Sequence, residues 1–189
     1  MNTLYIDTHS DCVDFVLFQE QQFFQKKYDN ARNSHSSVIM PLLDKFLKEL
    51  SLSVHDLTDI IVINGPGSFT GIRLGITIAK MLAFTLNIPI RVMSSILIKA
   101  ISNTDPGYFW FGEAEKNGYY VGKFNDLDEL VSDYVYIKKD SFTDFCEERK
   151  VLVDVSLDYQ RIFDFSRTLP IMNPHAVNPL YVKMIEVQK

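Results

Sequence analysis

A glycine-rich segment, residues 65–75, constrains this chain more than any other feature. The residues before it, 59–64, are apolar and β-branched, as in a short buried strand. Its glycines permit positive φ and close approach of the backbone, and Ser68 or Thr70 can cap a helix that follows. Residues 72–86 are apolar on nearly every side, so this predicted helix must be covered from more than one direction.

This segment matches neither of two common phosphate-binding motifs. A P-loop needs a lysine after its last glycine, whereas Gly71 and Gly75 are each followed by isoleucine. A dinucleotide-binding turn needs a third glycine, where Thr70 stands, and an acidic residue about 20 positions further on, where none occurs. The alternative that stays open is a looser anion-binding turn at the start of the helix, formed by Gly65, Gly67 and Ser68.

Small residues recur every four positions along the helix and form one ridge: Gly67, Gly71, Gly75, Ala79 and Ala83. A ridge of this kind lets a second helix approach closely. Two interpretations are open, because the ridge can pack inside the chain or against another subunit. Arg73 and Lys80 share a narrow charged stripe on the same helix.

The composition of the chain limits its possible domain organisation and binding partners. A chain of 189 residues with 47% hydrophobic residues can bury a core as one domain or as two small lobes. Its net charge of −5 argues against nucleic acid or an anionic membrane as its main contact. Cys12 and Cys146 are too few and too far apart for a disulfide framework or a zinc site. Without a leader segment or an apolar run near about 18 residues, we expect a soluble cytoplasmic protein that binds no membrane.

A run of turn-forming residues at 103–107 predicts a boundary between two lobes. The predicted first lobe, residues 1–102, opens with three antiparallel strands at 3–7, 12–18 and 22–28. Strands and helices then alternate, which favours a mixed five-stranded sheet flanked by helices. The predicted second lobe, residues 103–189, is smaller and begins with a hairpin.

An amphipathic helix is predicted over residues 34–50, where Pro41 either kinks it or marks its true start. Its apolar face is wider than one contact with a sheet requires. We therefore expect part of this face to contact a partner or a second copy of the chain. The apolar face consists of Val38, Ile39, Leu42, Leu43, Phe46, Leu47 and Leu50.

Several segments together resemble the TsaB (YeaZ) family. They are residues 4–8, the helix ending near 41–43, GPGSFTGIRLG at 65–75, and the closing residues 176–182. The resemblance implies an α/β fold of the actin-like, Hsp70-like ATPase (ribonuclease H-like) class with two lobes. It also implies a role in making threonylcarbamoyladenosine in tRNA. In that family the chain is a non-catalytic subunit that binds the catalytic paralogue TsaD, and the ATPase TsaE joins the complex.

The chain departs from the pattern of this family, or of the catalytic paralogues, at three places. The paralogues carry a metal-binding His-x-x-x-His pair, whereas His35 is followed four residues later by Ile39, so no metal site is expected. The second lobe is shortened. Acidic residues also occupy segment 113–118, onto which an arginine-containing stretch of the family maps.

Asp7 and Thr8 stand where actin-like ATPases bind phosphate. Those proteins usually place a glycine after the aspartate so that the backbone can approach the phosphates. Thr8 replaces that glycine, and Asp7 and Asp11 would repel an anion. Weak nucleotide or phosphate binding stays open here, but a competent ATPase is not expected. The residues concerned are Asp7, Thr8, Gly65, Gly67 and Ser68.

The sequence therefore predicts a scaffold subunit without catalytic residues. It predicts no cofactor, with ATP or ADP at a subunit interface as the alternative. Its expected partners are TsaD, TsaE through the complex, tRNA only through the complex, and a second copy when alone. Two alternatives are a small-molecule kinase of the same fold, using Asp7 and the glycine turn, and a homodimeric ligand-binding protein. The expected partner-contact residues are Gly71, Gly75, Ala79, Ala83, Arg73, Leu42, Leu43 and Phe46.

Overall fold

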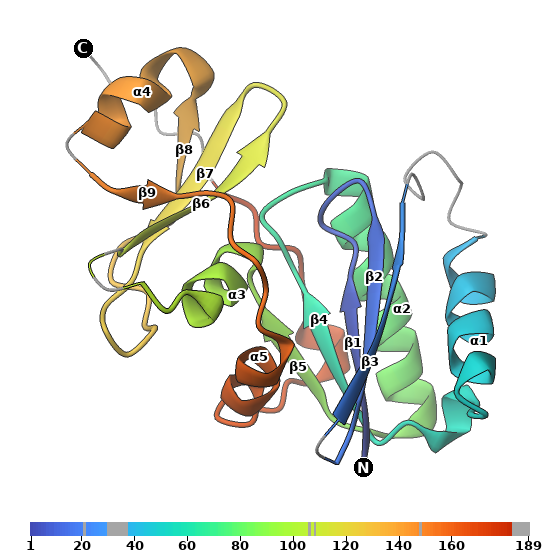
Figure 1. Ribbon diagram of the computed structural model, residues 1–189. Helices are drawn as coiled ribbons and strands as arrows, with labels where there is room; N and C mark the ends of the chain where they lie inside the picture. The colour runs from blue at the N-terminus through green and yellow to red at the C-terminus, as the bar shows by residue number, and fades with distance from the viewer. Residues whose placement is uncertain (21, 30–37, 106, 108, 148, 183–189) are drawn as a thin grey trace.

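The computed structural model describes residues 1–20, 22–29, 38–105, 107, 109–147 and 149–182, and it contains two sheets (Figure 1). The larger sheet has the strand order β3-β2-β1-β4-β5. Strand β1 pairs antiparallel with β2 and parallel with β4, so the sheet is mixed, as predicted. Its strands are β1 (Asn2–Asp7), β2 (Val13–Gln19), β3 (Gln22–Tyr28), β4 (Asp59–Ile63) and β5 (Ile90–Met93).

The central strands of this sheet are buried on both faces because successive side chains point in opposite directions. Leu4 and Ile6 join the core beneath α1 (Ile39–Glu49) and α2 (Phe69–Leu86). Tyr5 points the other way, into the core beneath α3 (Ser95–Ser102) and α5 (Tyr159–Ser166). The continuous apolar runs of β1 and β4 follow from this double coverage.

Among the described residues, the predicted amphipathic helix corresponds to α1, Ile39–Glu49. It begins at Ile39, so Pro41 lies in its first turn, where backbone N–H groups have no partner within the helix. The predicted start of the helix and His35 lie outside the described residues. Leu43 and Phe46 are buried in the core, and the Phe46 ring stacks 6.0 Å from that of Phe15 on β2.

The ridge of small residues on α2 packs inside the chain. A side chain at Gly71 would overlap the carbonyl oxygen of Thr8, and one at Gly75 would overlap the Thr8 hydroxyl. That hydroxyl donates to the carbonyl of Gly71 at 2.7 Å, while Ala79 and Ala83 are fully buried. The length and composition of α2 would suit a membrane span, but the helix covers the larger sheet, which accounts for its apolar character.

The smaller sheet has the strand order β8-β7-β6-β9. Helix α4 (Lys139–Glu147) packs on one face, where the ring of Phe142 stacks 3.6 Å from that of Tyr119. On the other face, Ile96 and Ala100 of α3 join Phe111 in a third core cluster. Helix α3 therefore packs against both sheets. The strands are β6 (Trp110–Glu115), β7 (Gly118–Lys123), β8 (Val135–Lys138) and β9 (Val151–Leu152).

The chain returns to the larger sheet after β9. Helix α5 packs there, and the following segment, residues 172–182, which we call the C-terminal strap, passes along α2 and includes a short 3-10 helix, η3 (Pro174–Ala176). The amide of Met172 donates to Ile90 O at 2.9 Å, and that of Leu180 to Asn64 O at 2.8 Å. A division at residue 102 separates the two sheets, but α5 and the strap lie beyond it and contact the first.

The contact between Gly71 and Thr8 makes a testable prediction about stability. Gly71→Ala should lower the free energy of unfolding by about 1–3 kcal/mol through overpacking, despite a gain in helix propensity of about 1 kcal/mol. Urea denaturation of the isolated chain measures the change. Thr85→Ala, at an exposed position of the same helix, is the control and should not destabilise. A Gly71→Ala variant that is as stable as the original chain would contradict this packing.

Candidate functional site

The outer face of α2 carries a stripe of exposed residues. Phe69, Arg73, Thr77, Met81 and Phe84 are spaced so that they share one side of the helix. Phe69 is 57% exposed, Met81 46% and Phe84 65%. Large apolar side chains gathered on one helix face, together with an arginine, are typical of a protein–protein contact.

The C-terminal strap lies beside this stripe and is held to it by the helix's two cations. The Arg73 guanidinium donates to the Tyr181 hydroxyl through Nε at 2.9 Å and Nη2 at 2.7 Å, and it lies 3.7 Å above the Phe69 ring. Lys80 Nζ donates to Val177 O at 3.0 Å and to His175 O at 3.3 Å. The strap thereby extends the outer face of α2 with an exposed tyrosine.

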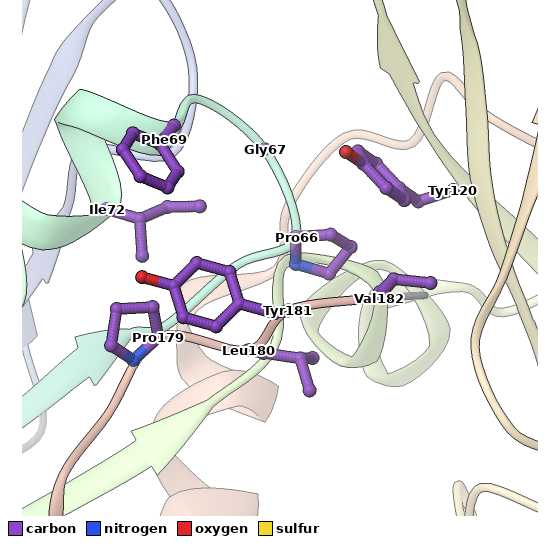
Figure 2. A pocket seen from close by; sticks show the side chains of 9 residues that line it. All are labelled: Pro66, Gly67, Phe69, Ile72, Tyr120, Pro179, Leu180, Tyr181 and Val182. Atoms are coloured by element: carbon purple, nitrogen blue, oxygen red, sulfur yellow. The ribbon is translucent and has the colours of Figure 1, made fainter. Parts of the chain in front are cut away.

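A small pocket of about 110 Å³ opens where the strap crosses the start of α2. Figure 2 shows Pro66 and Tyr181 between the first turn of the helix and Tyr120, which comes from β7 of the smaller sheet. Gly65 has a φ of +105°, a conformation that favours glycine. The pocket is lined by Pro66, Gly67, Phe69, Ile72, Tyr120, Pro179, Leu180, Tyr181 and Val182.

The second candidate site is the cleft between the sheets, of about 410 Å³, at the end of β1. Asp7 Oδ1 lies 2.5 Å from His9 Nδ1 and also accepts from the His9 amide at 3.0 Å. The other ring nitrogen, Nε2, lies 3.4 Å from Glu113 Oε2 on β6. Lys99 Nζ of α3 lies 2.6 Å from the same Glu113 oxygen. Two carboxylates and two cations thus meet in one buried chain of charges.

These contacts keep His9 protonated and the carboxyl groups of Asp7 and Glu113 ionised at neutral pH. Burial alone lowers the pKa of His9, but Asp7 and Glu113 outweigh it and raise the pKa from 6.5 to about 10. Burial raises the pKa values of Asp7 and Glu113, yet His9 lowers both below their ordinary values. Lys99 also lowers the pKa of Glu113. The charges in the network sum to zero, so it leaves no net positive charge for a phosphate.

A further acidic residue of this cleft, Asp14, is paired with Asp7 across strands β1 and β2. Burial raises the pKa of Asp14 on β2, although hydrogen bonds from Tyr159 and Gln25 partly oppose this. The Tyr159 hydroxyl of α5 donates to Asp14 Oδ2 at 2.5 Å, and the Gln25 amide donates to both carboxylate oxygens. This carboxylate is therefore engaged within the chain.

Two backbone amides at the glycine turn, those of Ser68 and Gly71, donate within the chain. The Ser68 amide donates to His9 O at 2.7 Å, and the Ser68 hydroxyl accepts from the Gly71 amide at 3.2 Å, which confirms Ser68 as the helix cap. The structure thus brings Asp7, Thr8 and the turn together, but with these donors directed at protein atoms. A nucleotide or phosphate here stays a prediction.

The structure buries most of the predicted partner-contact residues. Arg73 is exposed, while Leu42 is half-buried and its carbonyl accepts from the Tyr28 hydroxyl at 3.3 Å. The other positions face the chain's own interior: Gly71, Gly75, Ala79, Ala83, Leu43 and Phe46. Because these residues are already covered by other parts of the chain, we take the outer face of α2 as the candidate contact surface instead.

Sequence reasoning missed the residues that link distant segments. His9, Lys99 and Glu113 lie on three elements, and no spacing rule relates them. One signal was available for His9, which follows the buried Asp7 by two residues and can reach its carboxylate. In the sequence Tyr181 belongs only to the closing segment 176–182, and no sequence signal indicates its contact with Arg73.

Comparison with known proteins agrees with this architecture. Residues 25–157 match the family model described as TsaD: tRNA N6-adenosine threonylcarbamoyltransferase. The tRNA threonylcarbamoyladenosine biosynthesis protein TsaB of Bacillus subtilis is 31% identical over 180 residues, covering 87% of this chain and 76% of that protein. The Buchnera aphidicola (Schizaphis graminum) protein of the same name is 33% identical, covering 51% of this chain and 46% of its own length.

Solved structures confirm the predicted fold class. YeaZ from Pseudomonas aeruginosa superposes with a TM-score of 0.71 at 19% identity, covering 96% of this chain and 99% of that one. The mixed five-stranded sheet with helices on both faces places the protein in the actin-like ATPase fold class. Within that class, the chain belongs to the TsaB (YeaZ) family.

The buried charge network makes a prediction about pH. His9 binds its proton more tightly in the folded state, so its contribution is complete below about pH 6.5 and is lost as pH rises toward 10. The free energy of unfolding should fall over this range by at most about 1.4 kcal/mol per pH unit from His9 alone. Urea denaturation at several pH values should show a smaller fall for His9→Gln. Equal slopes for both proteins would contradict a protonated His9.

Proposed function

We propose that this chain is a non-catalytic subunit that serves the formation of threonylcarbamoyladenosine in tRNA. It binds a catalytic protein of the TsaD type through the outer face of α2. Membership of the TsaB (YeaZ) family supports the pathway. The observation that carries the binding role is the exposed stripe of Phe69, Met81 and Phe84, extended by Tyr181.

The chemistry of this surface supports a protein partner. Aromatic residues, methionine and arginine are enriched at the centres of protein interfaces, and such residues supply most of the binding energy. Arg73 is held by Tyr181 and stacked on Phe69, so its side chain has already lost much of its freedom before a partner arrives. When the partner is absent, the same face pairs two copies of this chain.

The state of the cleft supports a role without catalysis. Phosphoryl transfer depends on cations positioned at the phosphates. The two cations of the network, His9 and Lys99, lie against carboxylates of the chain itself. Thr8 also packs directly against Gly71 at the start of α2. These contacts argue against the kinase alternative.

The rest of the assembly follows from this role. TsaE joins through the complex, and tRNA is bound only through the complex, because a chain of net charge −5 attracts a polyanion poorly. Any ATP or ADP lies at a subunit interface. The site of action is the cytoplasm.

A substitution on the outer face tests the binding role. Phe84→Asp should weaken binding to TsaD by more than about 30-fold, since a central interface aromatic contributes roughly 2 kcal/mol or more. Isothermal titration calorimetry measures the affinity, and light scattering should show less self-association of the same variant. Leu127→Asp, at a position 72% exposed outside α2, is the matched control. If both variants bind TsaD as well as the original chain, the outer face of α2 is not the interface.

Reconstitution tests the absence of catalysis. The purified chain should neither hydrolyse ATP at a useful rate nor modify tRNA, and the modified nucleoside should appear only when TsaD and TsaE are added with their substrates. Phosphate release and nucleoside analysis by mass spectrometry are the two measurements. Steady ATP turnover by the chain alone, lost in Asp7→Ala, would favour the kinase.

A further inference from the structure

His9 contacts three parts of the molecule from the connection between β1 and β2. Its carbonyl oxygen accepts from the Ser68 amide, at the cap of α2, at 2.7 Å. Its ring is held by Asp7 at the end of β1, and its Nε2 lies 3.4 Å from Glu113 on the smaller sheet. The ring is only 10% exposed. One residue therefore lies between the start of α2 and the second sheet.

The contact with α2 leaves little room for independent movement. A side chain at Gly67 would come within 2.5 Å of the His9 carbonyl oxygen, so the two backbones are in close contact. The preceding residue, Thr8, donates from its hydroxyl to Gly71 O at 2.7 Å. Because residues 8 and 9 are tied to the first turn of α2 twice, a displacement of His9 displaces that turn as well.

The contact with the second sheet is equally well anchored. Glu113 is paired with Lys99 of α3 at 2.6 Å, and Lys99 Nζ also donates to Gly112 O at 2.9 Å and to Val153 O at 2.8 Å. Lys99 thus holds Glu113 and two segments beside it in one position. In a buried setting the charges of Glu113 and His9 are weakly screened, so their attraction responds strongly to separation.

We propose that the His9–Glu113 ion pair couples the position of the smaller sheet to the first turn of α2, so that partner affinity depends on how the two sheets are held together. The coupling itself is a property of the isolated chain. Its effect on affinity rests on the proposed function of the outer face of α2.

Amide hydrogen exchange on the full chain tests the coupling without any partner. Glu113→Gln keeps the size of the side chain and removes its charge. The amides of Ser68 and Gly71 should then exchange about tenfold faster, through local opening of the first turn of α2. The amide of Ile60, which donates to Pro89 O in the larger sheet, reports global opening and should change less.

Two further variants isolate the ion pair. His9→Gln should raise exchange at the same amides at least as much as Glu113→Gln, because it removes the contact with Asp7 as well as the ion pair. The double variant should exchange no faster than His9→Gln, because that variant already lacks the His9–Glu113 pair. Glu49→Gln is the matched control, since Glu49 pairs with Lys26 at 2.9 Å on the exposed surface between α1 and β3. Unchanged exchange at Ser68 and Gly71 in Glu113→Gln, or a rise matched at Ile60, overturns the coupling.

Calorimetric titration with TsaD tests the effect on affinity. Glu113→Gln should weaken binding about fivefold or more, the range expected for coupling between two sites, and Glu49→Gln should not. Faster exchange with unchanged affinity would overturn the link to the partner and leave the proposed function intact. If the original chain does not bind TsaD at all, the proposed function fails together with that link, while the exchange data still decide the coupling.

Discussion

The contact between Thr8 and the small residues of α2 is the constraint on which the rest of this structure depends. Gly71 and Gly75 allow the helix to approach the end of β1 so closely that any side chain would overlap Thr8. That approach lets α2 cover β1 and β4 and turns its remaining side outward. One face of α2 therefore builds the core of the larger lobe, and the opposite face is exposed.

The same close approach engages groups of the cleft that could otherwise contact a ligand. The His9 carbonyl accepts from the Ser68 amide of the glycine turn, and the Thr8 hydroxyl donates to the Gly71 carbonyl. The nearby cations are balanced by Asp7 and Glu113. Because these charges are balanced within the chain, the site has no net positive charge that would attract a phosphate. The proposed role as a binding subunit and the proposed coupling through His9 both follow from this internal balance.

Much of the fold could be predicted from the sequence because its signals are local. The apolar β-branched run of β4, the cap at Ser68 and the spacing of apolar residues in α1 each depend on neighbours a few positions apart. The mixed order of the larger sheet followed from three antiparallel strands leading into alternating strands and helices, and from the family resemblance. The sequence left the effect of Pro41 open between a kink and a start, and in the described residues Pro41 lies in the first turn of α1.

The sequence alone shows that α2 has a ridge of small residues and that other parts of a protein must cover this helix. It does not show which segment or subunit covers it. The residue spacing of the ridge is the same whether it packs against Thr8 of the same chain or against another subunit. The tertiary structure was therefore needed to distinguish these two interpretations. The same holds for His9, Lys99 and Glu113, whose meeting depends on the relative placement of two sheets. Local patterns specify elements and their faces, whereas contacts between elements depend on how those faces are matched in space.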